Sequence, residues 1–90
     1  MQLKIFKENI FLEVIEAKSR WISYENVRVM GREEDFQHPN TLRMSRTDFT
    51  ELMKFVGFDE IPDIPFFWGC HVVFDEKCYR PKFTIESRKQ

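Results

Sequence analysis

The sequence predicts a small α+β fold, and two patterns carry that prediction. From Ser45 to Gly57, apolar residues recur at the spacing of an amphipathic helix. From Phe66 to Glu86, apolar and polar residues alternate as in half-buried strands. The chain has 90 residues, of which 42% are hydrophobic, a size and composition typical of one globular domain. We therefore expect a single domain over residues 1–90, with an N-terminal β segment, one central helix and a C-terminal hairpin.

The N-terminal β segment is expected to begin with a short strand at residues 3–6. Residues 10–17 fit two structures, a helix with one broad apolar side or the second strand of a hairpin. The hairpin sets Phe6 opposite Phe11 and also creates a pair of opposite charges across the ladder, and we favour it for that reason.

The next segment, residues 21–30, contains Trp, Ile, Tyr and two Val and is closed by Gly31. β-Branched and aromatic residues are enriched in strands, so we expect a further strand here. Residues 31–41 are expected to form a loop, since a proline follows His38 and disfavours helical backbone there.

The central helix is predicted at about residues 46–56. Ser45 is a suitable N-cap, and Asp48 three residues later approximates a capping box. Gly57 is the expected terminator. The predicted core face consists of Phe49, Leu52, Met53 and Val56.

The C-terminal hairpin is predicted at about residues 67–86, with an Asp75–Cys78 turn that sets Phe74 opposite Tyr79. Residues 79–86 should form an edge strand, because Pro81 cannot donate a ladder hydrogen bond. The apolar face of this hairpin comprises Trp68, Cys70, Val72, Phe74, Tyr79, Pro81, Phe83 and Ile85. We expect Cys70, Val72, Phe74, Phe83 and Ile85 to be buried and Arg80, Lys82 and Glu86 to be exposed.

Charge and length give no indication of a membrane or secreted protein. The formal net charge is −1, so no global attraction to nucleic acid or anionic lipid is expected. No apolar run approaches the roughly 20 residues of a membrane span. The N-terminus carries charges where a signal peptide needs an apolar stretch. We expect a cytoplasmic protein with two free thiols.

No catalytic or metal-binding motif stands out. The spacing of Cys70, His71 and Cys78 matches no usual zinc pattern, and the hairpin would point Cys70 and His71 to opposite faces. We expect no metal, no cofactor and no enzymatic activity. An enzyme remains an alternative only if loop 31–41 meets the acidic cluster at residues 59–63 around a cation.

A protein-binding surface is the function that we favour. The segment from Ile61 to Trp68 is apolar, and Pro62 and Pro65 limit its unbound conformations, which lowers the entropy cost of binding. The partner is expected to be another protein or a second copy of the chain. The predicted surface combines this loop with the adjoining edge strand, and its residues are Ile61, Ile64, Phe66, Phe67, Arg80 and Lys82.

A small nucleic-acid-binding protein is the alternative. In the predicted hairpin, His71 lies between Arg80 and Lys82 across the ladder, with Phe67 on the same side. Sheet faces that bind single strands combine such charge with exposed aromatic residues. Four further residues are candidates to extend the basic strip: Arg20, Arg28, Arg43 and Arg46.

One stretch resembles a known kind of protein. The order Leu42-Arg-Met-Ser, then Phe49-x-x-Leu52 to Gly57, then Phe66-Phe-Trp-Gly-Cys-His-Val-Val-Phe-Asp-Glu is similar to that of small bacteriophage-encoded proteins of unknown function. Those proteins run strand, short helix and hairpin, and the similarity covers residues 42–76. The resemblance implies a virus-encoded accessory protein that binds a host factor in a bacterial cytoplasm and acts as its inhibitor or modulator. It assigns no functional residue.

Overall fold

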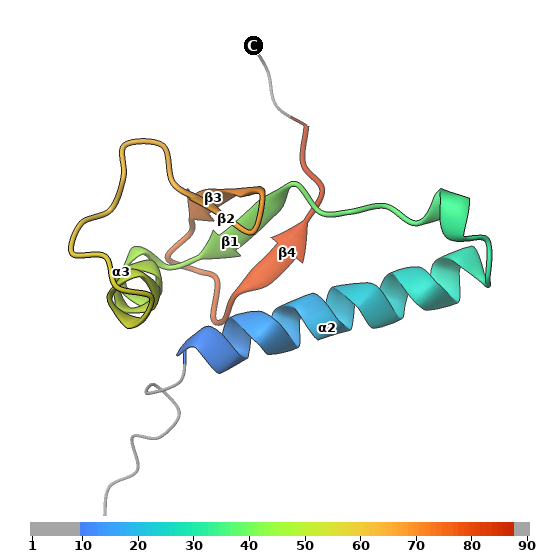
Figure 1. Ribbon diagram of the computed structural model, residues 1–90, viewed down its shortest axis with the longest axis horizontal. Coiled ribbons are helices and arrows are strands. Elements are labelled where there is room, and N and C mark those ends of the chain that lie inside the picture. Colours follow the sequence, from blue (N-terminus) through green and yellow to red (C-terminus); the bar gives the residue numbers. More distant parts are fainter. Residues whose placement is uncertain (1–9, 88–90) are drawn as a thin grey trace, which may run out of the picture.

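The structure, a computed structural model, describes residues 10–87. The strand expected at residues 3–6 therefore lies outside the described residues. Over these residues the architecture is α+β, with two α-helices and a four-stranded mixed sheet (Figure 1). In chain order the elements are α2 (Ile10–Val29), the 3-10 turn η1 (Glu33–Asp35), β1 (Thr41–Met44), α3 (Arg46–Phe55), β2 (Phe66–Phe67), β3 (Cys70–Phe74) and β4 (Lys82–Thr84).

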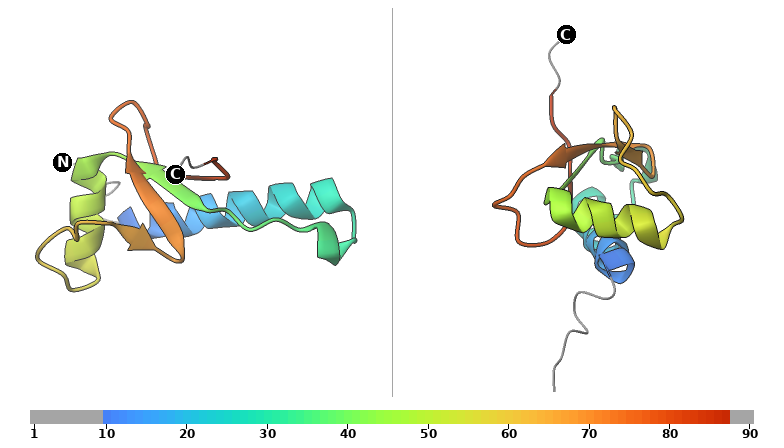
Figure 2. Two further views of the ribbon diagram at one scale, coloured as in Figure 1. Left: turned by 90° about the horizontal axis from the view of Figure 1, so that it is seen from above. Right: turned by 90° about the vertical axis from the view of Figure 1, so that its left-hand side faces the viewer.

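The sheet has the strand order β2-β3-β1-β4, which makes β2 and β4 its two edges. Strand β1 runs parallel to β3 and antiparallel to β4. Both helices lie on the same face of the sheet (Figure 2). In the register, Val72, Leu42 and Phe83 form one row that points toward the helices.

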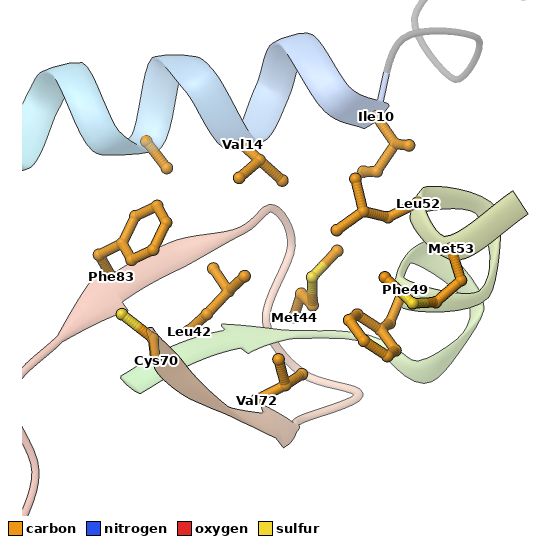
Figure 3. Packing of buried hydrophobic residues seen from close by; sticks show 11 residues of the cluster. Ile10, Val14, Leu42, Met44, Phe49, Leu52, Met53, Cys70, Val72 and Phe83 are labelled. Carbon is orange, nitrogen blue, oxygen red and sulfur yellow. The ribbon is translucent and has the colours of Figure 1, made fainter. Parts of the chain in front are cut away.

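The core lies between this sheet face and the two helices (Figure 3). Leu42, Phe49 and Leu52 are completely buried. Helix α2 adds Val14, and Ile10 lies beside Leu52 where the two helices meet. Burial of each large aliphatic or aromatic side chain contributes about 1.5–3 kcal/mol, so this cluster is the main source of stability.

The strands expected over residues 10–17 and 21–30 are wrong, because both segments belong to the single helix α2. The favoured hairpin with Phe6 is excluded for the same reason, and the helical alternative for residues 10–17 is correct. One face of α2 points inward: Ile10, Val14, Ala17, Glu25 and Val29 are buried, and Trp21 between them is half-buried. Burial of this face outweighs the weak strand preference of β-branched and aromatic residues.

The central helix is confirmed as α3. The Ser45 hydroxyl accepts a hydrogen bond from the Asp48 backbone N–H, as expected of an N-cap. Gly57 follows the helix with φ +101°, a backbone conformation that side chains with a Cβ rarely adopt. Phe49, Leu52 and Met53 are buried as predicted, whereas Val56 is 38% exposed.

The hairpin predicted between residues 67 and 86 is wrong. Strands β3 and β4 are not neighbours, because β1 lies between them and pairs with both. The hairpin that does form joins β2 to β3 through Trp68 and Gly69, both with positive φ, as in the tight turns that suit hairpins. The edge position expected for residues 79–86 is confirmed by β4.

Most of these side chains are buried or exposed as predicted, although the predicted strand pairing is wrong. Cys70, Val72 and Phe83 are buried, and Arg80 and Lys82 are exposed, as expected. Phe74 and Glu86 are half-buried, and Ile85 is 46% exposed. Two other residues expected on the apolar face are also exposed, Trp68 at 45% and Tyr79 at 89%. Alternation is a property of each strand and does not depend on its neighbour, which explains why it survives.

Candidate functional site

The segment between α3 and β2 encloses an apolar groove of about 440 Å³, which we call the Phe58 groove. One wall is the end of α3, and the other is the loop that leads into β2. The lining residues are Met53, Val56, Phe58, Glu60, Ile61, Pro62, Ile64, Phe66 and Phe67. All four loop residues of the predicted partner surface are therefore among them.

Apolar side chains stand exposed around this groove. Ile64 is 67% exposed, Phe58 58% and Phe66 48%. In contrast, Ile61 and Phe67 are half-buried and pack against the core cluster. The loop is thus anchored by two of its apolar residues and presents the others to solvent.

Three exposed carboxylates, Asp59, Glu60 and Asp63, lie in the same loop. The nearest turn of α3 contributes Lys54, which is also exposed. Glu60 is the one charged residue that lines the Phe58 groove, and the loop around it is predominantly acidic. An apolar groove beside an acidic loop favours a partner that presents apolar and basic side chains.

The two basic residues of the predicted partner surface lie elsewhere. Arg80 precedes β4 and Lys82 begins it, whereas the Ile61–Phe67 loop leads into β2 at the opposite edge of the sheet. The expectation that loop and basic strand adjoin is wrong, because it depended on the β3–β4 hairpin. Lys82 instead lines a second groove, which we call the β4 groove, of about 430 Å³ between β4 and α2.

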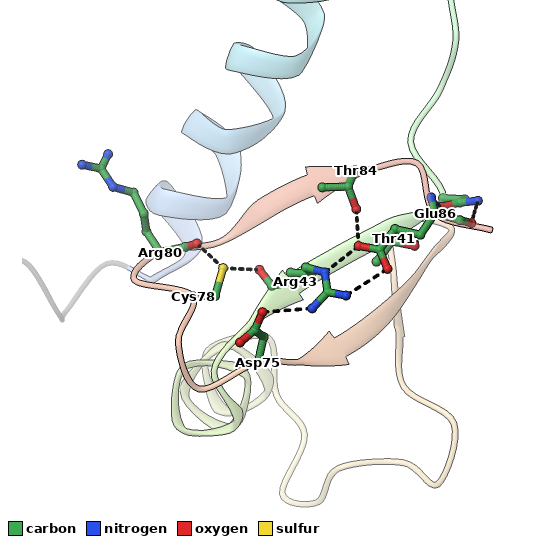
Figure 4. A network of polar contacts seen from close by, with 8 residues as sticks. Thr41, Arg43, Asp75, Cys78, Arg80, Thr84 and Glu86 are labelled. Carbon is green, nitrogen blue, oxygen red and sulfur yellow. Dashed lines mark hydrogen bonds and ion pairs between the residues drawn. The ribbon is translucent and has the colours of Figure 1, made fainter. Parts of the chain in front are cut away.

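The outer face of the sheet carries a network of paired charges at its centre (Figure 4). The Arg43 guanidinium donates to both Glu86 carboxylate oxygens and, at 2.9 Å, to Asp75 Oδ2. The hydrogen bond to Glu86 is the main reason why the pKa of Arg43 is raised. Arg43 is thus fully engaged within the protein.

The other arginines proposed for a basic strip are dispersed. Arg28 pairs with Glu25 on α2, and Arg46 lies over the Phe74 ring at 4.9 Å. Only Arg20 lies near Lys82, in the β4 groove. The predicted position of His71 between Arg80 and Lys82 is wrong, since His71 pairs with β1 and its ring contacts the tilted ring of Phe66 at a centroid distance of 4.3 Å.

The two thiols are free and lie in separate surroundings. Cys70 is buried and donates to the Pro39 carbonyl, whereas Cys78 contacts the carbonyl oxygens of Arg43 and Arg80. Burial raises the pKa of both thiols, and the Asp75 carboxylate adds to this for Cys78. A raised pKa lowers the thiolate fraction and hence the nucleophilicity of both groups.

The two acidic segments considered for a cation lie at opposite ends of the molecule, η1 beside the end of α2 and residues 59–63 beyond α3 (Figures 1 and 2). Among residues 10–87, no three His, Cys, Asp or Glu side chains form a group that could hold a metal ion. The arrangement that would have supported a metal enzyme is therefore not formed by these segments.

Several residues were not predicted to line a groove, although Val56 was expected in the core and Arg20 in the basic strip. Val56 and Phe58 line the Phe58 groove, and Arg20, Trp21 and Tyr24 line the β4 groove. Arg20, Trp21 and Tyr24 follow Ala17 at helical spacing and therefore lie on one side of α2. If this segment had been predicted as a helix, the spacing would have indicated that the three residues share a face.

Comparison with protein-family models, with curated proteins and with solved structures finds no match to this chain. Within residues 10–87, no helix combines the length and the apolar content needed to cross a membrane.

Proposed function

We propose that this protein is a non-enzymatic binding protein whose principal contact surface is the Phe58 groove. The observation that carries the proposal is the exposure of Phe58, Ile64 and Phe66 around one apolar groove. Exposed apolar residues that gather around a concave surface are typical of sites that bind other proteins. A single exposed apolar residue outside any groove is ordinary and needs no function.

The partner is a protein segment that inserts an apolar side chain and carries basic residues beside it. The apolar part follows from the groove lining, and the basic part from Glu60 in that lining with Asp59 and Asp63 in the same loop. Pro62 and Pro65 restrict the loop before it binds, so little further ordering is required. If the resemblance to bacteriophage proteins holds, the partner is a bacterial protein.

The test is affinity capture from a bacterial lysate with three baits: the wild-type chain, an Ile64→Asp variant and a Val27→Asp variant. Val27 is the matched control, since it is 75% exposed on α2 and lies outside the Phe58 groove, whereas Ile64 is 67% exposed within it. Both variants should melt like the wild-type protein, because exposed sites contribute little to stability.

We expect the wild-type and Val27→Asp baits to capture one protein that the Ile64→Asp bait does not capture. Loss of an apolar anchor at the centre of an interface typically weakens binding by about 2 kcal/mol or more, roughly a 30-fold change in Kd. Equal capture by all three folded baits would contradict the proposed surface. Dimerisation of the wild-type chain in sedimentation, abolished by Ile64→Asp, would identify a second copy as the occupant.

A further inference from the structure

We infer that the free edge of β4 is a second binding surface, which accepts an extended acidic segment of a partner protein as an added strand. This surface lies at the opposite edge of the sheet from the Phe58 groove. The inference therefore goes beyond the proposed function, and the two can fail separately.

The backbone of β4 leaves hydrogen-bonding groups on its outer side. The Thr84 carbonyl accepts from the Asn40 N–H, so Thr84 faces β1. Backbone groups of successive residues in a strand alternate in direction, so the N–H and C=O of Phe83 point the other way. On that side, residues 10–87 supply no further strand. An incoming extended segment can pair with both groups, as in other cases of strand addition.

The β4 groove supplies space beside these groups. Its wall on α2 consists of Ala17, Arg20, Trp21 and Tyr24, and its wall on the strand runs from Pro81 to Ile85. Tyr24 is 63% exposed and Ile85 46%, so both can cover the side chains of an added strand. Trp21 is fixed in place, since its indole N–H donates to the Gln37 carbonyl at 2.9 Å.

The positive charges beside the β4 groove favour an acidic partner segment. Arg20 and Lys82 both line the groove and are exposed, Arg80 lies next to Pro81, and none of the three forms an ion pair within the described part of the chain. This distinguishes them from Arg43, whose charge is balanced by Asp75 and Glu86. Unpaired cations at the rim attract carboxylates and repel basic segments.

The same charges disfavour two other occupants. Antiparallel pairing of β4 with the β4 of a second copy through Phe83 would set Lys82 opposite Thr84 and Arg80 opposite Glu86. The Glu86 carboxylate already binds Arg43, so a second copy offers this rim no acidic residue that is not already engaged. Residues 1–9 of the chain contain Lys4 and Lys7 and one acidic residue, Glu8, so they match this basic rim poorly.

The experiment measures amide hydrogen exchange of the full chain with two synthetic probes, an extended peptide that alternates Glu with Val and its counterpart with Lys in place of Glu. Strand addition should slow exchange at the Phe83 N–H by about tenfold when the acidic peptide is present at about ten times its Kd. The Lys peptide should leave the exchange rate unchanged.

In a charge-reversed chain, R20E/K82E, the preference should be inverted: only the Lys peptide should slow exchange at the Phe83 N–H. The matched control K54E/K77E carries the same change in net charge at exposed sites outside the β4 groove and should behave like the wild-type chain. No effect of either peptide at Phe83 would overturn the inference, and so would an undiminished response of R20E/K82E to the acidic peptide. Protection of Phe83 that grows with protein concentration alone would assign the edge to a second copy and would also overturn it.

Discussion

The two halves of helix α2 are held in place by different forces. Near its start, Ile10, Val14 and Ala17 are buried in the apolar core. Toward its end, the buried Glu25 accepts hydrogen bonds from Arg28, at 2.8 Å from Nη2, and from the Gln37 backbone N–H. The first half depends on the removal of apolar surface from water, whereas the second half relies strongly on charged hydrogen bonds to the loop that follows it.

This difference matters for the β4 groove, because its wall on α2 lies between the two halves. Trp21 and Tyr24 are positioned by the helix, and Trp21 is also tied to Gln37, the residue that contacts Glu25. The apolar half is therefore expected to contribute more to the free energy of unfolding. The polar half determines how firmly the outer end of α2 is held against its loop.

The largest effect is expected from Leu52→Ala, which removes the α3 side chain that packs beside the apolar half of α2. Leu52 is completely buried beside Ile10, and its truncation should lower the free energy of unfolding by about 2–5 kcal/mol. The matched control is Leu12→Ala on α2, since Leu12 is 50% exposed and should change stability by only about 0.5 kcal/mol. Urea titrations of both variants measure the difference, and similar losses would show that the buried face is assigned wrongly.

An intermediate effect is expected from Glu25→Gln, which weakens the polar half. The hydrogen bond from Arg28, followed by that from Gln37, lowers the pKa of Glu25 in the folded protein. Glu25 therefore stabilises the fold above its unfolded pKa, and this contribution is lost as the pH falls through the lower, folded pKa.

The variant should melt below the wild-type protein at neutral pH, by less than Leu52→Ala does. It should also lose less stability than the wild-type protein on acidification. Melting curves across the acidic range measure both effects. A Glu25→Gln variant with the full acid sensitivity of the wild-type protein would show that other carboxylates are responsible.

The smallest effect is expected from Arg32→Ala. Its ion pair with Asp35 lies in the same region as the Glu25 contacts, yet the side chains are 60% and 47% exposed. Exposed pairs contribute about 0–1 kcal/mol, and added salt screens them. Chemical denaturation at low and high salt measures this contribution, and a loss larger than that of Glu25→Gln would reverse the ranking of the two contacts.

The sequence was sufficient to predict the parts of the fold that depend on local pattern. Helix α3 follows from the Ser45 cap and the spacing of its apolar residues, and the inward facing of Cys70 and Phe83 follows from alternation. Two features depended on distant contacts and were missed. The core selects a helix for residues 10–29 despite their strand-like composition, and β1 pairs with two strands that lie much further along the chain.

The candidate sites also differ in whether they depend on local pattern or on distant contacts. The two prolines and the apolar residues around Ile64 were sufficient to suggest a binding loop. Its assumed neighbour, the Arg80–Lys82 strand, was misplaced because an error in pairing moves an entire strand to another edge. The β4 groove could not be predicted at all, since it is formed by β4 and by a helix that had been assigned as strands.

The central claim, that the Phe58 groove is the principal contact surface, is tested most directly by site-specific photo-crosslinking. A benzophenone amino acid replaces Ile64 in one full-length chain and Val27 in another, and each is irradiated in a bacterial lysate. We expect a discrete covalent adduct with one protein from position 64 and none from position 27. Adducts of equal yield from both positions, or an adduct from position 27 alone, would contradict it.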